Sequence, residues 1–207
     1  IKDRQYTTQV ESHARRSAQT AMWHLAEALC RWIAPILSFT AEEIWENLPG
    51  GRERSVFLSA WYADLPSEIA DSNLGNAFWD EVITVRQAVN RALEVRRAAG
   101  DLKGSLDAEV TLYAEPGLVQ RLGQLGDELR FVLITSEATL KPAAEAPENT
   151  PESDVTGLAV TVSVSGHEKC ERCWHRRPDV GDSQEHPTLC GRCISNIDGQ
   201  GEHRRYA

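Results

Sequence analysis

The sequence lacks a run of eighteen apolar residues, which is about the length that a membrane-spanning helix needs. Its first residues, IKDRQYTTQVESHARR, also lack the apolar core and the small-residue cleavage site of a secretory signal. We therefore expect a cytoplasmic protein that does not contact a membrane. Met22 is the only methionine and lies well inside the sequence, so we also expect the chain to be a part of a longer protein.

The chain does not have the basic excess of a broadly basic nucleic-acid-binding protein, because its net charge is −9. The negative charge is unevenly distributed. From His167 to Ala207 seven basic residues are balanced by seven acidic ones, so all of the excess negative charge lies upstream. The last segment therefore differs in charge from the rest of the chain.

A catalytic set is missing as well. The sequence contains no glycine-rich phosphate loop, no positioned serine or cysteine nucleophile, and no carboxylate pair whose spacing marks it out. The chain itself is therefore predicted to bind a partner and to catalyse nothing.

Three helices are predicted in the first half. Apolar residues recur at spacings of three and four between Thr8 and Ile36, which is typical of a helix with one buried face, and Pro35 should end or kink it. The third helix, Asn76 to Ala99, has its own apolar stripe and precedes Gly100. The first stripe consists of Ala14, Ala18, Met22, Leu25, Leu29, Trp32 and Ile36; the other consists of Phe78, Val82, Val85, Val89 and Leu93.

The second helix is predicted in LSFTAEEIWENLPG. Thr40 and Glu43 have the spacing of a capping box, and Phe39 and Ile44 have that of a hydrophobic staple. The run Pro49-Gly50-Gly51 should stop the helix. Together the three helices predict a bundle.

The next segment has the pattern of a small α/β unit. AEVTLYA, FVLITSEATL and GLAVTVSV are predicted strands, and PGLVQRLGQLGDELR is a predicted helix interrupted by glycines. The segment 141–154, rich in Pro, Ala and Glu, is predicted to be a mobile surface loop. The fold class is therefore mainly α with a small α/β unit. We expect domains at 1–103, 104–164 and 165–207.

The third domain contains two Cys-x-x-Cys pairs, Cys170 with Cys173 and Cys190 with Cys193. Two such pairs separated by sixteen residues can surround one tetrahedral zinc ion. Four protein ligands leave no open position for water, so the zinc is expected to be structural. Redox-active pairs are typical of a βαβ context, which this segment lacks. Structural disulfides are rare in the cytosol. Cys30 is predicted to be a core residue.

Histidines are the other possible ligands of this domain. His175, His186 and His203 are expected to be solvated or to contact a partner, because four cysteines already complete the coordination.

Trp174 follows the first pair directly, among Arg176, Arg177, Arg192 and Arg205. An aromatic ring among arginines is suited to stacking on an unpaired nucleotide base while the cations contact phosphates. The alternative is that Trp174 covers the small core of the zinc domain. The residues alone leave both interpretations open.

Several motifs carry a family resemblance over essentially the whole chain. The run PILSFTAEEIWENLPG resembles the helical anticodon-binding domain of the class I synthetases for isoleucine, valine, leucine and methionine. VRQAVNRALEVRRAAGDLKGSLDAEVTLYA and GHEKCERCWHRRPDVG with CGRCISNIDGQGEHRRYA are similar to the C-terminal region of bacterial isoleucyl-tRNA synthetases.

This resemblance implies a helical-bundle anticodon-binding domain followed by a small junction unit and a four-cysteine zinc finger. It implies that the four cysteines bind zinc, that Trp174 contacts the anticodon loop, and that the partner is tRNA(Ile). The parent enzyme would be an ATP-dependent isoleucine–tRNA ligase, whose catalytic and editing domains are absent from this chain. The four arginines are proposed from composition alone.

Two alternatives remain at this point. A DNA-repair glycosylase of the formamidopyrimidine type has a similar zinc finger, but its helical part is markedly basic and its nucleophile is an N-terminal proline, whereas this chain begins with Ile1. The second alternative is a free-standing synthetase-like protein that binds tRNA without charging it. We expect a monomer that does not bind DNA.

Overall fold

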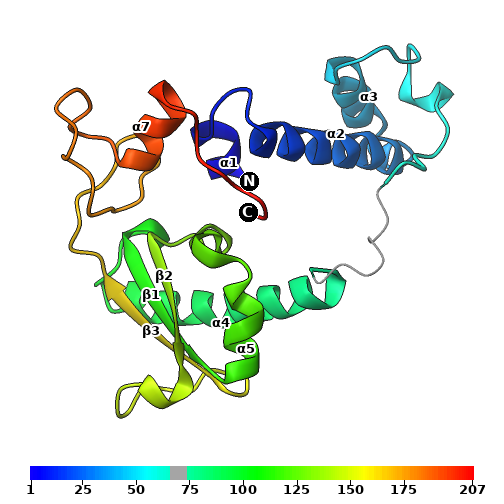
Figure 1. The fold of residues 1–207 in the computed structure, drawn as a ribbon. Coiled ribbons are helices and arrows are strands. Elements are labelled where there is room, and N and C mark those ends of the chain that lie inside the picture. Colours follow the sequence, from blue (N-terminus) through cyan, green and yellow to red (C-terminus); the bar gives the residue numbers. More distant parts are fainter. Residues whose placement is uncertain (66–73) are drawn as a thin grey trace. The chain divides into compact units, whose positions relative to one another are not determined.

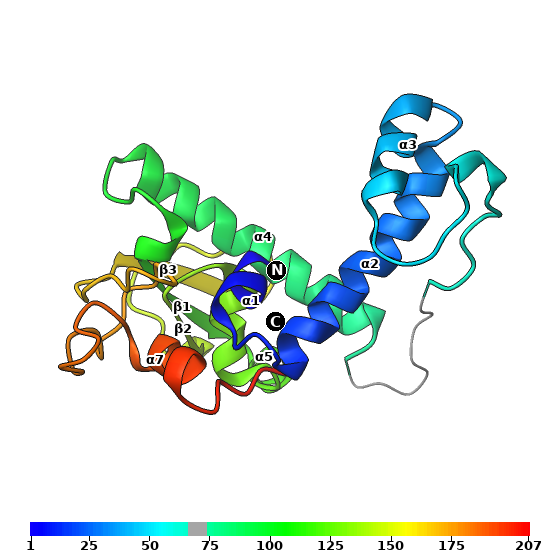
Figure 2. The same cartoon turned by 90° about the horizontal axis from the view of Figure 1, so that it is seen from above.

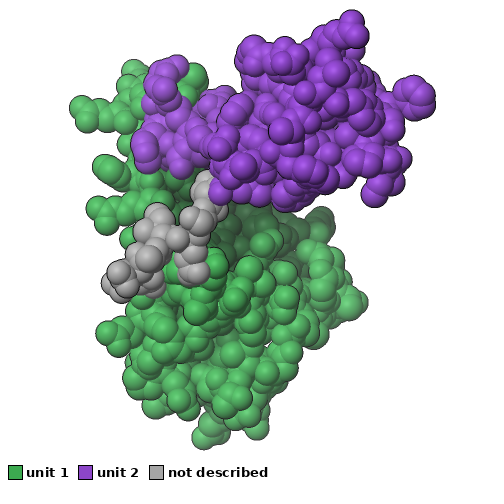
Figure 3. Space-filling view, turned by 90° about the vertical axis from the view of Figure 1, so that its right-hand side faces the viewer, with its two compact units in different colours: residues 1–10, 70–207 green, residues 11–69 purple. Residues whose placement is uncertain are grey.

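The computed structural model describes residues 1–65 and 74–207. The chain divides into two compact units, one formed by residues 11–69 and the other by residues 1–10 together with 70–207 (Figure 3). Each unit is described by itself below. Among the described residues, none of the helices has the length and apolar character needed to cross a membrane.

The unit of residues 11–69 contains helix α2 (His13–Ile33), helix α3 (Ser38–Asn47) and a 3-10 turn at Val56–Leu58. The hydroxyl of Ser12 caps α2 by accepting a hydrogen bond from the backbone N–H of Arg15. Figure 2 shows α3 packed beside α2. Their shared core consists of Cys30, Ala34, Ala41, Trp45 and Val56.

The predicted buried face of α2 is correct only in its first half. Ala14 and Ala18 are buried, whereas the five later members of the stripe, from Met22 to Ile36, are between 38% and 82% exposed. The face that α3 covers carries Cys30 and Ala34. The spacing correctly predicted a helix, but the position of α3 selects which side of that helix is buried.

The predicted capping box of α3 is wrong. The helix begins three residues earlier, since Leu37 rather than Thr40 is its N-cap and the carbonyl of Leu37 accepts the N–H of Ala41. Thr40 therefore lies inside the first turn, and Phe39, which is 93% exposed, forms no staple. The helix does end before Pro49, as predicted.

The other unit is built on a three-stranded sheet in the order β2-β1-β3. β1 (Ala108–Ala114) and β3 (Leu158–Val164) are antiparallel and confirm two predicted strands, while β2 (Glu137–Pro142) runs parallel to β1. β1 and β2 are connected through α5 (Pro116–Gly123) and α6 (Leu129–Leu133), which are separated by a 3-10 turn. The predicted glycine interruption of this helix is confirmed.

One strand prediction is wrong in its first half. FVLITSEATL contains the end of α6, and β2 begins only at Glu137. Leu129 and Leu133 lie one helical turn apart and are both buried. A short apolar run such as this one fits a buried helix turn as well as a strand, so its pattern could not decide between them. In the predicted loop 141–154, residues Ala143–Glu145 form a 3-10 turn and Glu152 bridges Ala159. Its mobility stays a prediction.

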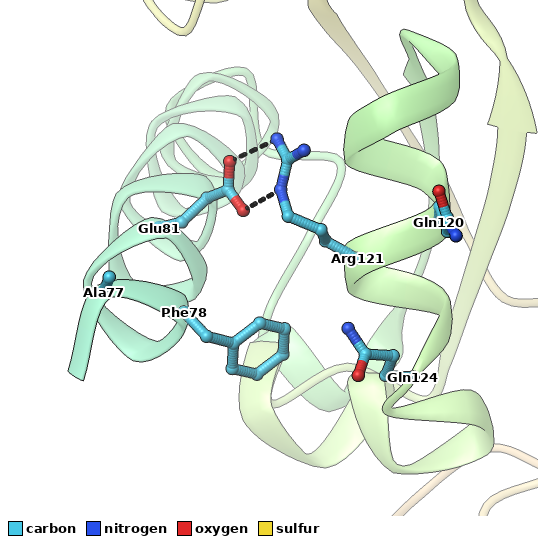
Figure 4. A pocket seen from close by; sticks show the side chains of 6 residues that line it. All are labelled: Ala77, Phe78, Glu81, Gln120, Arg121 and Gln124. Carbon is cyan, nitrogen blue, oxygen red and sulfur yellow. Dashed lines mark hydrogen bonds and ion pairs between the residues drawn. The ribbon is translucent and has the colours of Figure 1, made fainter. Parts of the chain in front are cut away.

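Helix α4 (Asn76–Ala98) confirms the third predicted helix, and all five members of its apolar stripe are buried. They pack against the sheet, α5 and α6 in a single apolar cluster. Figure 4 shows α4 beside α5, where Glu81 and Arg121 form a bidentate ion pair with distances of 2.6 and 2.7 Å. A mainly helical chain with a small mixed unit is therefore confirmed, but a three-helix bundle is not.

The segment that follows β3 is mostly irregular, with helix α7 (Gly191–Asp198) near its end (Figure 1). It contacts the short helix α1 (Lys2–Thr7) from the opposite end of the sequence. This segment and α1 carry the candidate site.

Candidate metal centre and aromatic knuckle

The four predicted cysteine ligands lie together. The Sγ atoms of Cys170, Cys173, Cys190 and Cys193 are all within 4.8 Å of one another, and all four residues are buried. In a tetrahedral site with Zn–S bonds of about 2.3 Å, neighbouring sulfurs are about 3.8 Å apart. The distance between Cys173 Sγ and Cys190 Sγ is 3.8 Å. The cluster therefore fits one structural zinc ion.

Backbone hydrogen bonds shape the first cysteine pair into a tight knuckle. The N–H of Trp174 donates to the carbonyl of Cys170 over 2.8 Å, and the N–H of Cys170 donates to the carbonyl of His175 over 2.9 Å. Trp174 has a positive φ of 65°, which closes the turn. The two sulfurs of this pair are thereby held on one side of the turn.

The second pair is placed by α7. Cys190 is the N-cap of this helix, and its carbonyl accepts the N–H of Ile194 over 3.1 Å. Its own N–H donates to Cys170 Sγ over 3.4 Å, which joins the two pairs. The first turn of α7 then brings Cys193 to the same point.

The thiols also influence one another electrostatically. Hydrogen bonds from Cys190 and Cys193 lower the pKa of Cys173, and the corresponding hydrogen bond to Cys173 raises the pKa of Cys190 to about 12. Four mutually contacting sulfurs cannot all ionise unless a cation balances them. Zinc binding, which displaces thiol protons, provides that balance.

One of the three histidines, His175, contradicts the prediction that these side chains are solvated or contact a partner. His175 is not solvated: it is buried, its ring packs edge-on against Phe131 at a centroid distance of 5.6 Å, and its Nδ1 lies 3.2 Å from the carbonyl oxygen of Cys173. His186 is paired with Asp198 over 2.7 Å, and His203 is exposed. No local pattern could predict that Phe131 covers His175, because the two residues are far apart in the chain.

Trp174 projects from the knuckle with 62% of its surface exposed. The Nζ atom of Lys169 lies 5.6 Å from the centroid of its ring. The apolar neighbours of the sulfur cluster are instead Val180 and Leu189. Trp174 therefore does not cover the core of the zinc module.

Three of the four predicted arginines are engaged within the protein. Arg176 pairs with Asp107 over 2.8 Å, and Arg177 pairs with Glu137 over 2.6 Å. These ion pairs connect the zinc module to the α/β unit.

Arg192 is the most enclosed, with 11% of its side chain exposed. It pairs with Asp3 over 2.8 Å and with Glu202 over 3.3 Å. Arg205 has an exposed side chain, while its backbone N–H donates to Glu128.

An ionic cluster that was missed from the sequence surrounds Asp3. Burial alone would raise the pKa of this carboxyl group, but hydrogen bonds and charges from Arg192 and Arg204 hold it well below its ordinary value. The guanidinium groups of Arg192 and Arg204 also lie 4.9 and 3.6 Å from the centroid of Phe131. Its members come from both ends and the middle of the chain, so no local spacing could reveal it.

The tail is also fixed by one side chain. The carboxylate of Glu128 accepts backbone hydrogen bonds from Arg205, Tyr206 and Ala207 over 2.6, 2.7 and 2.8 Å. Three consecutive N–H groups form a concave anion site that a carboxylate fills. The zinc module is therefore attached to the α/β unit on both sides of α7.

Comparison with known proteins agrees with this geometry. Residues 1–112 match the family described as the anticodon-binding domain of tRNA ligase, and residues 168–196 match the zinc finger found in FPG and IleRS. The four cysteines lie within the second match.

The relatives are similar over all 207 residues. The chain is 59% identical to the isoleucine–tRNA ligase of Alcanivorax borkumensis, 58% to that of Pseudomonas aeruginosa strain UCBPP-PA14 and 56% to that of Nitrosococcus oceani. In each case the whole chain is covered, and it spans 22% of the relative's length. This favours the ligase interpretation over the glycosylase one. Because the family match extends over more than half of the sequence, the chain belongs to the anticodon-binding domain family of tRNA ligases.

Proposed function

We propose that this chain is the C-terminal tRNA-binding portion of a cytoplasmic isoleucine–tRNA ligase and that it recognises the anticodon stem-loop of tRNA(Ile). The longer protein would attach isoleucine to this tRNA using ATP, with its chemistry in domains outside these residues. The observation that carries the proposal is the similarity to isoleucine–tRNA ligases along the entire chain. An exposed tryptophan on a buried four-sulfur knuckle supplies the contact surface.

The metal ligands of the proposed site are Cys170, Cys173, Cys190 and Cys193. Their burial and short mutual distances support a single structural zinc, which would hold the knuckle rigid. No catalytic role is proposed for the metal, since four thiolates complete its coordination.

Trp174 is proposed to stack on an unpaired base of the anticodon loop. A side chain in the left-handed backbone region costs about 1–2 kcal/mol relative to the ordinary one, and glycine is the usual residue there. Trp174 is both left-handed and largely exposed, so its packing does not offset that cost. Such a residue is expected where its side chain has a function.

The four arginines are proposed as tRNA contacts, ranked by how exposed their side chains are. Arg205 has an exposed side chain, and Arg176 and Arg177 keep part of theirs exposed beside their ion pairs. Arg192 is the weakest candidate because its guanidinium group is enclosed by Asp3 and Glu202. We also retain the division into domains 1–103, 104–164 and 165–207, a monomeric state and the lack of DNA binding as proposals.

The test compares the affinity of the zinc-loaded chain for tRNA(Ile) and tRNA(Val) at one fixed salt concentration. We expect tighter binding of tRNA(Ile) and a loss of about 1–3 kcal/mol of that binding in Trp174→Ala, the range for one stacking aromatic residue. Ile197→Ala, an exposed change on α7 in the same module, is the control and should bind as the unmodified chain does. Equal affinities for both tRNAs in all variants would contradict the proposal.

A further inference from the structure

A cavity of about 600 Å³ lies beside the knuckle, within the unit that carries the zinc module. Its walls are mostly apolar, and its volume is within the range of about 300–1,000 Å³ that is common for small-ligand pockets. Residues of α1, the end of α6 and the knuckle form the walls. They include Tyr6, Phe131, Ile134, Arg172, Trp174 and His175.

Two strained residues border this cavity. In the described part of the chain, the residues other than glycine with positive φ are Ile134 at 59°, Asn149 at 67° and Trp174 at 65°. Asparagine is common in this conformation, whereas a β-branched or bulky residue is a genuine outlier. The two outliers line the same cavity.

Ile134 ends α6 at a position where glycine is the usual residue. Ile134 is 44% exposed, so burial offsets only part of the backbone strain. A strained, half-exposed isoleucine that forms part of a cavity wall indicates a contact made by its side chain.

The aromatic residue Tyr6 reaches the cavity from α1 and is 75% exposed. The guanidinium group of Arg172 holds the end of that helix, because its Nη1 donates to the carbonyl of Thr7 over 2.5 Å and its Nη2 donates to that of Tyr6 over 3.4 Å. The ion pairs of Asp3 fix the beginning of α1. Two aromatic rings from separate, anchored elements therefore border one apolar space.

We propose that this cavity receives one unstacked RNA base, with Tyr6 and Ile134 as recognition residues beside Trp174; this inference rests on the proposed function. Aromatic faces and apolar walls suit the flat surface of a base, and the positive charge of Lys169 near the Trp174 ring suits the neighbouring phosphate. An apolar peptide segment is the competing occupant.

The test uses an RNA trinucleotide with 2-aminopurine at its centre, a base whose fluorescence falls when it stacks. Titration of the zinc-loaded chain should quench this probe saturably. Tyr6→Ala and Ile134→Ala should each weaken its binding by roughly 5- to 150-fold, while Tyr6→Phe, which keeps the ring, should retain it. Ile197→Ala is matched to Ile134→Ala because it is 46% exposed, and it should change nothing.

Two further measurements separate recognition from folding. Ile134→Gly should raise the melting temperature, because glycine relieves the backbone strain, and should still weaken binding of the probe. The slope of log affinity against log salt should stay the same in Tyr6→Ala, since that change removes no phosphate contact. A purely structural role would lower stability and affinity together.

Lack of quenching in the unmodified chain would overturn this inference, whatever the outcome with tRNA(Ile) and tRNA(Val). Quenching that depends on Tyr6, accompanied by equal affinities for the two tRNAs, would support the base cavity and contradict the proposed function. If the apolar dye anilinonaphthalene sulfonate binds in a Tyr6-dependent manner and the trinucleotide does not displace it, the cavity is a docking site for a protein segment.

Discussion

The α/β unit and the zinc module are stabilised by different means. The sheet, α4, α5 and α6 share one large apolar cluster, in which residues such as Val82, Leu112 and Leu122 are completely buried. The buried cluster of the zinc module consists of four cysteines with two partly buried apolar neighbours. The first region is expected to fold by burying apolar surface, and the second depends on a metal and on ion pairs to its surroundings.

Removal of zinc should have the largest effect, because it should destabilise the zinc module and not the α/β unit. Because structural zinc in small finger modules contributes about 10–16 kcal/mol at neutral pH, chelation should unfold residues 165–207 and leave the α/β unit folded. Hydrogen exchange followed by mass spectrometry would locate the loss of protection, and metal analysis should find one zinc per chain beforehand.

Two cysteine variants serve as controls for the chelation experiment. Cys193→Ala should reproduce the effect of the chelator, whereas Cys30→Ala, which alters a buried cysteine in the unit of residues 11–69, should keep the zinc. Unchanged protection of residues 165–207 after complete zinc removal would show that the module does not need the metal.

Truncation of the apolar core should affect the other region. Leu112→Ala removes a fully buried side chain from β1 and should lower the free energy of unfolding by about 2–5 kcal/mol without changing the zinc content. Its register partner Leu140 on β2 is only partly buried, so Leu140→Ala should cost less. Chemical denaturation measures both; equal costs would contradict the placement of the core.

Asp3→Asn tests the ionic connection between α1 and the zinc module. It removes the charge that balances Arg192 and Arg204, and we expect a loss of about 1–3 kcal/mol, below the range for a fully buried pair because 22% of the Asp3 side chain is exposed. Chemical denaturation at neutral pH, followed by tryptophan fluorescence, measures this loss.

The same variant has a defined pH dependence. The pKa of Asp3 is lower in the folded protein than its unfolded value of about 3.9, so its stabilisation is present above about pH 4 and is lost as the pH falls through the folded pKa. The difference between the unmodified chain and Asp3→Asn should therefore shrink below about pH 4. A difference that stays constant down to acid pH would assign the effect to packing.

Local patterns were sufficient for the elements whose packing agrees with their own periodicity. The stripe of α4 is buried as its spacing predicts, β1 and β3 match their alternating runs, and the cysteine spacing correctly predicted the sulfur cluster. Local patterns gave wrong predictions where packing against a segment distant in the sequence determines which residues are buried or where an element begins. The exposed half of the α2 stripe, the start of α3 and the helical end of FVLITSEATL are the three cases.

The amino-acid sequence by itself determined the four-cysteine cluster, most helices and strands, and the family, because each depends on residues at short and regular separations. Only the tertiary structure decided that Arg192 serves Asp3, that Phe131 covers His175, and that Tyr6 and Ile134 meet Trp174 at one cavity. Those contacts join residues separated by many tens of positions. They exist because α1, α6 and the knuckle bury charge and apolar surface against one another, which no pattern within a single segment records.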